Sequence, residues 1–234
     1  GPFVRELEIS FSNNWNCIRD GAPYAPITIY EETAALERMQ IRLLEDGYSP
    51  CSGDLTLTSP YLRNTREIMI EKFDAATKSI EVEQLLLNDT KTLKALARAA
   101  KRGVKVRLLV DPAKHLYYRD WKGGPNNKAV GMVEELKREH PELAIEVRHY
   151  TVAPGQELHV KMCIIDDKTL GMGSTNFSSG AFQSNYELFA FIEGAGIVSD
   201  FSAMFETDWK TRSEAPPKLN LGHKIISIFS DVIF

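Results

Sequence analysis

Residues 158–187, LHVKMCIIDDKTLGMGSTNFSSGAFQSNYE, decide the fold of this chain and point to a functional site. His159 and Lys161 are two positions apart, so on a strand their side chains point to the same face. The apolar run at 162–165 is typical of a buried strand. The aspartates at 166–167 end that run and predict a turn.

The polar residues around this strand predict one pocket with complementary chemical groups. The imidazole of His159 can attack phosphorus or protonate a leaving oxygen. Lys161 offers a positive charge to phosphate oxygens, and Ser174 and Asn176 offer neutral donors to the same oxygens. A carboxylate such as Glu187 can hold the imidazole in one tautomer. This chemistry needs no metal cluster, so no cofactor is expected.

The spacing of these residues is more specific than any one of them. A His-x-Lys pair alone is common and carries little information. Here the pattern His-x-Lys-x4-Asp at 159–166 is followed by Gly-Ser-x-Asn at 173–176 and Asn-x-Glu at 185–187. The combined pattern resembles the signature of the phospholipase D superfamily.

This resemblance implies a role for each residue of the pattern. In that family the histidine is the nucleophile or the general acid, and the lysine and the asparagine bind phosphate. Carried over, these roles fall on His159, Lys161 and Asn176, with Ser174 beside them. The resemblance also makes Asp166 a structural partner and Glu187 the residue that orients His159.

Length and composition limit the remaining interpretations. The chain has 234 residues, 43% of them hydrophobic, which is enough for one large domain or one domain plus a fragment. The net charge of the chain is -4, so the chain lacks the strongly basic character typical of nucleic-acid-binding domains. No apolar run reaches the roughly 18 residues that a membrane-spanning helix needs.

The three cysteines do not form the framework of a disulfide-rich domain. Cys163 falls in the predicted core strand, which predicts a buried thiol. Cys17 and Cys51 flank one segment, and the sequence leaves open whether they pair.

The first 54 residues are expected to precede the functional module. Residues 3–16 have an amphipathic helical pattern that matches residues 197–210 after a shift of 194 positions. We interpret residues 1–16 as the closing helix of a preceding module, with coincidence between two amphipathic helices as the alternative. Residues 17–54 are interpreted as a linker, in which 31–47 are either helical or partly extended.

Residues 55–212 are predicted to form the phospholipase D-like module. Strands are expected at 55–58, 79–87, 104–110 and 144–150, and helices at 63–79, 90–102, 129–140 and 197–210. Strand–helix–strand order with short connections predicts parallel pairing. The segment ALARAAKRGVKVRLLV also resembles the family. The expected fold is α/β, with a mixed, mostly parallel sheet flanked by helices on both faces.

Two segments outside these elements have more than one interpretation. The aromatic and basic stretch at 112–128 leaves the end of a strand, where ligands often bind, and either lines the site or forms a packed surface loop. The apolar tail, residues 213–234, either docks on the domain, packs on another half of the enzyme or lies in a membrane interface. Docking on the domain is the favoured alternative.

The expected function is histidine-based phosphodiester chemistry on a phospholipid, by hydrolysis or by phosphatidyl transfer. The chain resembles the second half of two-motif members such as cardiolipin synthase, in which His159 would be the acid and base. Its expected partners are the upstream half or a second copy of the chain, and peripheral contact with a membrane is favoured. A nuclease of the same superfamily and a non-catalytic interaction half-domain are the alternatives; the NFSS stretch at 176–179 favours the nuclease, and the acidic pI favours lipid.

Overall fold

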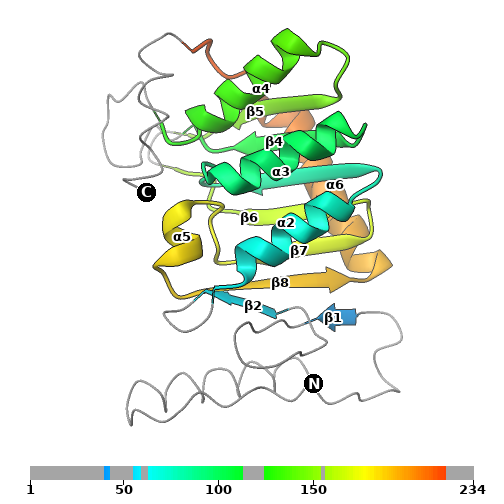
Figure 1. Ribbon diagram of the computed structural model, residues 1–234. Helices are drawn as coiled ribbons and strands as arrows, with labels where there is room; N and C mark the ends of the chain where they lie inside the picture. The colour runs from blue at the N-terminus through cyan, green and yellow to red at the C-terminus, as the bar shows by residue number, and fades with distance from the viewer. Residues whose placement is uncertain (1–39, 43–54, 59–62, 113–123, 154–155, 220–234) are drawn as a thin grey trace.

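A computed structural model describes residues 40–42, 55–58, 63–112, 124–153 and 156–219 (Figure 1). The expected helix at 3–16, the cysteines Cys17 and Cys51, most of the stretch at 112–128 and the tail beyond 219 lie outside the described residues.

Nine strands of the described chain form one sheet, in the order β1-β8-β7-β6-β3-β4-β5-β9, with β2 also paired to β8. The strands are β1 (Gln40–Arg42), β2 (Leu55–Thr58), β3 (Ser79–Gln84), β4 (Lys105–Val110), β5 (Ile145–Tyr150), β6 (Lys161–Ile165), β7 (Thr169–Gly173), β8 (Glu187–Glu193) and β9 (Ser213–Glu214). The helices are α2 (Thr65–Ala75), α3 (Thr90–Lys101), α4 (Asn127–Glu139), α5 (Ser179–Gln183) and α6 (Ala195–Thr211).

The mixed α/β architecture predicted from the sequence is confirmed, but the balance of strand pairings differs from the expectation. Parallel pairing joins β3 to β4 and β4 to β5, whereas the other described pairs are antiparallel. Parallel neighbours require a long crossover, which α3 and α4 supply. From β6 to β8 the chain instead returns through shorter connections, which produce antiparallel pairs. The sheet is therefore mixed and mainly antiparallel.

Local sequence signals explain why α3 begins and ends where it does. The Asp89 carboxylate accepts a hydrogen bond from the Thr92 backbone N–H at 2.8 Å, which caps the first turn. Beyond the last turn, Gly103 adopts a φ of 94°, the left-handed conformation that ends many helices. The helix predicted at 90–102 is thus confirmed within one residue.

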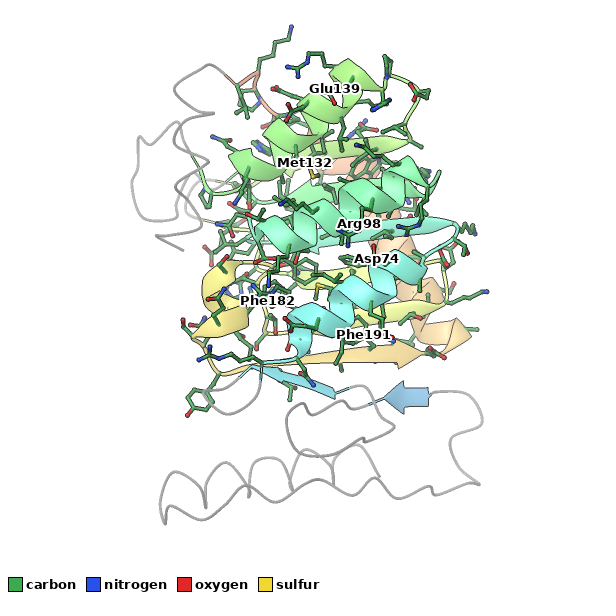
Figure 2. All side chains as sticks on the ribbon, in the orientation of Figure 1. Asp74, Arg98, Met132, Glu139, Phe182 and Phe191 are labelled. Carbon is green, nitrogen blue, oxygen red and sulfur yellow. The ribbon has the colours of Figure 1, made fainter. Side chains whose placement is uncertain are left out.

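The helices cover both faces of the sheet (Figure 1). α2, α3 and α4 pack on one face, over a core that includes a cluster of five phenylalanines. Phe177 lies at the centre of that cluster, with ring centroids 5.8–6.4 Å from three others. α6 covers the opposite face, where Phe205 and Trp209 pack on β4, β6 and β7. Figure 2 shows Asp74 and Arg98 facing each other between α2 and α3, joined by hydrogen bonds of 2.7 and 3.0 Å.

The described residues bear on two further expectations, the conformation of 31–47 and the burial of Cys163. Within the segment 31–47, Gln40–Arg42 form a strand that pairs with β8, so the partly extended alternative holds there and a continuous helix is wrong. An unpaired strand edge offers free backbone groups, which explains this pairing. Cys163 is a fully buried free thiol, and burial raises its pKa to about 12. No helix of the described chain is long and apolar enough to cross a membrane.

Leu219, the last described residue of the segment that follows β9, docks on the domain. Its side chain packs against the α2–α4 face of the core, and its backbone N–H donates to Glu134 at 3.4 Å. Docking on the domain, the favoured alternative for the apolar tail, holds at this residue, while residues 220–234 lie outside the description.

The α6 face also buries an unpaired carboxyl group. Glu81 is hydrogen-bonded to Arg107 at 3.1 Å, but neither oxygen of the fully buried Glu83 has a hydrogen-bond partner in the described chain. Burial, and to a smaller extent the charge of Asp208, raises the pKa of Glu83 to about 8. The group is therefore protonated at neutral pH.

We predict that Glu83 makes the stability of the protein depend on pH. The folded chain holds a proton that the unfolded chain releases above the ordinary carboxyl pKa of 4.5. The free energy of unfolding should fall as pH rises from about 4.5 to about 8, by up to about 1.4 kcal/mol per pH unit. Urea unfolding followed by tryptophan fluorescence should show this slope for wild type and a flatter one for Glu83→Gln. Equal slopes would show that Glu83 is already ionised in the folded chain.

A second prediction concerns the close approach of β7 and β8. A Cβ atom at Gly173 would overlap the Leu188 carbonyl oxygen and lie 2.7 Å from the Phe189 Cα. Because both neighbours are backbone atoms that cannot move away, Gly173→Ala should destabilise the fold by about 1–3 kcal/mol. Gly196→Ala is the matched control: a Cβ there meets nothing within 4 Å, and alanine favours the helix by up to about 1 kcal/mol. Thermal melting of the two variants measures the contrast, and equal melting temperatures would contradict it.

Candidate active site

The sheet topology gathers the predicted site residues at one end of the sheet. β6 is antiparallel to β3, so the first residue of β6 lies beside the last residue of β3. β7 ends and β8 begins at the same end, and α5 connects them there (Figure 1). Five predicted site residues belong to these strand ends or to the segments that adjoin them: His159, Lys161, Ser174, Asn176 and Glu187.

Lys161 is a buried cation at this end of the sheet. The residue is 7% exposed, and its Nζ donates a hydrogen bond to the His159 backbone oxygen at 3.0 Å. Burial lowers the pKa of Lys161, although the charges of Glu157 and Glu187 act in the opposite direction. A cation in such surroundings is screened less by water, so an anion that reaches it is attracted strongly.

His159 lies just before β6, with its ring directed to solvent. Its side chain is 68% exposed, and Nε2 lies 3.8 Å from the Glu157 carboxylate. The backbone on each side of it is held in place. The Leu158 N–H donates to the Asp111 carboxylate at 2.7 Å, and the Val160 oxygen accepts from the Leu85 N–H at 3.1 Å.

Asn126 connects the strand ends that hold this segment. Its Nδ2 donates to the backbone oxygens of Leu85 and Asp111, both at 2.8 Å. Its Oδ1 accepts from the Leu87 N–H at 2.7 Å. The amide thus uses both donor hydrogens and its acceptor on backbone groups that directly follow the neighbouring strands β3 and β4, in a buried position. We call Asn126 and Asp111 together the strand-end clamp.

Among the described residues, Glu187 forms no hydrogen bond or ion pair with His159. Ser174 Oγ donates to Glu187 Oε2, and Asn185 Nδ2 donates to Glu187 Oε1 at 3.0 Å. Ser174 Oγ in turn accepts from the Leu188 N–H at 3.1 Å. Glu187 therefore fixes the loop that follows β7, and its expected role as the residue that orients His159 stays a prediction.

The loop that contains Asn176 is pinned to the end of β3. The Phe177 N–H donates to the Leu86 oxygen at 2.9 Å, and the Phe177 oxygen accepts from the N–H groups of Asn88 and Asp89, both at 3.0 Å. These bonds place Asn176 beside the β3 end. Its Oδ1 is buried and has no protein partner within the described chain.

Asp166 lies at the opposite end of β6 from Lys161. Its carboxylate accepts hydrogen bonds from the backbone N–H groups of Thr77, Lys78 and Ser79, at 2.7–3.1 Å. Partial burial acts to raise the pKa of Asp166, but these hydrogen bonds outweigh it and lower the pKa. The geometry agrees with a structural partner that holds the α2–β3 turn, separate from the residues at the other end.

Sequence reasoning missed three polar residues at the site end of the sheet: Gln84, Asp111 and Asn126. Gln84 ends β3, Asp111 follows β4, and Asn126 precedes α4. The carboxyl ends of parallel strands meet at one edge of a sheet, so these positions in the sequence could have identified the three residues as site candidates. Among the described residues, no group of three or more histidine, cysteine, aspartate or glutamate side chains is arranged to hold a metal ion.

Comparison with known sequences adds a family assignment. A family model described as "Cardiolipin synthase, PLD-like domain" matches residues 69–209. Cardiolipin synthase A of Pseudomonas aeruginosa is 25% identical over 222 residues, covering 93% of this chain and 39% of the relative. Cardiolipin synthase 1 of Staphylococcus aureus is 27% identical over 233 residues, covering 97% and 42%. The chain thus spans about two fifths of the length of these relatives.

Solved structures share the fold at low sequence identity. Nuc from Salmonella typhimurium, described as a phospholipase D family member, is 21% identical with a TM-score of 0.54, covering 69% of this chain and 96% of that chain. Phosphatidylserine synthase from Haemophilus influenzae is 12% identical with a TM-score of 0.63, covering 88% and 48%. These likenesses confirm the expected α/β fold.

We predict that Asp166 contributes to stability through its backbone contacts. Asp166→Asn keeps the side-chain shape and the tolerance of a positive φ, here 56°, but turns an amide group toward backbone donors. The free energy of unfolding should fall by about 1–2 kcal/mol at neutral pH. Because the folded pKa is lowered, this contribution is present above the ordinary value of 3.8 and is lost as pH falls through the folded pKa.

Asp167→Asn provides the matched control for that measurement. Asp167 also has a positive φ, of 54°, but its side chain is 49% exposed and, within the described chain, forms an ion pair with Lys78 alone. Exposed ion pairs contribute about 0–1 kcal/mol, so this variant should unfold close to wild type in urea. If both variants lose the same stability, the backbone contacts of Asp166 are not the cause.

Proposed function

Because the chain belongs to the phospholipase D-like domain family of the cardiolipin synthases, we propose that it performs phospholipase D-type chemistry on a phospholipid phosphodiester. The observation that carries the proposal is the buried Lys161, whose ammonium donates to the backbone oxygen of His159, while the His159 ring two residues earlier is exposed. A phosphate at Lys161 would have an imidazole within reach, and the family pattern at 173–187 would surround it. We extend the module to residues 55–212, supported by the family match over 69–209 and by the pairing of β2 with β8.

We assign His159 the role of general acid and base. It would protonate the alkoxide oxygen that leaves phosphorus, and would then remove a proton from water or from an acceptor alcohol. Lys161 and Asn176 would bind the non-bridging phosphate oxygens, whose negative charge grows in the transition state. Ser174, fixed by Glu187, would complete the loop around the phosphate. Hydrolysis and phosphatidyl transfer differ only in the acceptor.

The proposed chemistry needs a second histidine as nucleophile. The sequence contains one His-x-Lys-x4-Asp pattern. We propose that an upstream half of the same enzyme, or a second copy of this chain, supplies the nucleophile and covers the site. The proposed closing helix of a preceding module at 1–16 and the linker at 17–54 fit the first alternative, and a peripheral membrane contact would bring the lipid to the site.

His159→Ala should lower the rate of headgroup release by about 10²–10⁴-fold, the usual contribution of a general acid or base. The assay uses phosphatidylglycerol and phosphatidylcholine vesicles with the chain alone and with its upstream half, beside single-stranded DNA. His140→Ala is the matched control, because His140 is a surface residue paired with Glu142, at the C-cap of α4 and away from the start of β6. A variant at position 159 that keeps the wild-type rate in an active assembly would refute the assignment.

The same assay separates the alternatives. Cleavage of DNA without headgroup release would favour the nuclease alternative, which the NFSS stretch at 176–179 supports. Absence of both activities in the presence of the upstream half would favour a non-catalytic interaction half-domain.

Activity should also survive excess EDTA. The proposed mechanism moves protons and binds phosphate through side chains alone. Rates measured with and without the chelator should agree within error. Loss of activity that added zinc or magnesium restores would overturn this mechanism.

A further inference from the structure

The described chain places one carboxylate, that of Glu157, next to the His159 ring. Oε1 of Glu157 lies 3.8 Å from Nε2 of His159. The two residues are two positions apart in the segment that leads into β6, and both are exposed, whereas Leu158 between them is buried. Side chains alternate along an extended backbone, so the carboxylate and the imidazole lie on the same face.

The backbone that carries this pair is held in place. The Leu158 N–H, midway between the two side chains, donates to the buried Asp111 carboxylate at 2.7 Å. The oxygen of Val160 accepts from the Leu85 N–H at 3.1 Å. Because the backbone is fixed, only side-chain rotation must be restricted to keep the carboxylate close to the ring, which lowers the entropic cost of the contact.

Glu187, the residue that the family pattern suggests for contact with His159, has both carboxylate oxygens engaged elsewhere. Oε2 accepts from Ser174, and Oε1 accepts from Asn185 at 3.0 Å. Those bonds hold the loop that follows β7. Among the described residues, Glu157 alone forms an ion pair with the His159 imidazole.

The ionisable groups around His159 come from three segments of the described chain. Glu157 and Lys161 lie on its own segment, Asp111 directly follows β4, and Glu187 begins β8. The Lys161 ammonium, bonded to the His159 backbone oxygen, disfavours a second positive charge beside it. Glu157 offsets this effect, because an opposite charge next to an imidazole favours its protonated form.

We propose that Glu157 is the positioning residue for His159, whose ring it holds and keeps in the protonated form that a general acid needs. This role rests on the proposed function, in which His159 gives a proton to the leaving alkoxide oxygen. In that step an N–H bond of the ring breaks, an O–H bond forms on the leaving oxygen, and the imidazole becomes neutral. Glu157 keeps its charge throughout. Because it lies beside Nε2, Nδ1 is the nitrogen left to exchange the proton.

The same carboxylate opposes the binding of phosphate. Burial lowers the pKa of Lys161 and the charge of Glu157 acts in the opposite direction, so the carboxylate lies within electrostatic reach of the ammonium. A phosphate bound to that ammonium would be repelled by Glu157. Removal of the Glu157 charge should therefore slow proton transfer and tighten phosphate binding at the same time. A substitution that only loosened the fold would weaken both.

Glu157→Gln tests these two opposite effects in the active assembly of the headgroup-release assay. Its kcat should fall about fivefold, the upper value for an exposed ion pair. Inorganic phosphate should bind about twofold more tightly in titration calorimetry. The alkaline limb of the kcat/KM profile should move about half a pH unit lower, because the ring loses its proton more readily without the carboxylate. Glu157→Asp, which keeps the charge on a shorter side chain, should restore part of kcat.

Glu142→Gln is the matched control for this variant. Glu142 forms an exposed pair of the same spacing with His140, at 3.5 Å, at the C-cap of α4. Its substitution should leave kcat, the alkaline limb and the phosphate affinity at their wild-type values. Melting curves confirm that each variant is folded.

The outcomes separate the positioning role from the proposed function. If Glu157→Gln keeps the wild-type kcat and alkaline limb while His159→Ala is inactive, the proposed function stands and the positioning role is wrong. The role is also wrong if the glutamine variant loses kcat and phosphate affinity together. If His159→Ala keeps the wild-type rate, or if no assembly releases the headgroup, the proposed function fails and the role of Glu157 fails with it.

Discussion

The three hydrogen bonds of the Asn126 amide are the constraint on which the geometry of the site depends. They join the backbone beyond β3 to the end of β4, at distances of 2.7–2.8 Å. Asp111, whose backbone oxygen accepts one of them, then holds the Leu158 N–H with its own carboxylate. The position of His159 is thus set by a buried polar clamp. Breaking buried hydrogen bonds of this kind costs more free energy than breaking a surface contact.

The order of the strands converts this local clamp into a site. Because β6 runs opposite to β3 and β4, its first residues reach the end where the two parallel strands finish. The β7–β8 connection returns to the same end, where Glu187 fixes Ser174. Asp166 closes the far end of β6 by holding the α2–β3 turn. One end of the sheet carries the groups that we propose bind phosphate, and the other end carries the backbone contacts of Asp166.

Much of this site could be predicted from the sequence, because its motif is local. His159 and Lys161 lie two residues apart on one strand, and the turn that follows is marked by two aspartates that tolerate a positive φ. α3 could equally be predicted from the sequence, because its N-cap Asp89 and the glycine that ends it, Gly103, lie next to it in the chain.

Other features depend on contacts between distant segments and gave no local signal. The partners of Asn126 are backbone groups 15 to 41 residues away, and Asp111 reaches a residue 47 positions further on. The strand propensity of Gln40–Arg42 also could not show that they pair with β8, because the formation of an edge strand depends on the strand beside it. The mainly antiparallel character of the sheet follows from the short connections from β6 to β7 and from β7 to β8. The βαβ pattern earlier in the chain does not indicate which strands β6, β7 and β8 pair with.

The most direct test of this account measures amide hydrogen exchange at Leu158 in wild type and in Asn126→Ala. If the strand-end clamp holds the segment before His159, the Leu158 amide should exchange at least about tenfold faster in the variant, since breaking such a buried bond costs upward of about 1.4 kcal/mol. The Cys163 amide, in the middle of β6, should keep its protection and serves as the internal reference. Unchanged protection at Leu158 in the folded variant would contradict the claim that this clamp sets the position of His159.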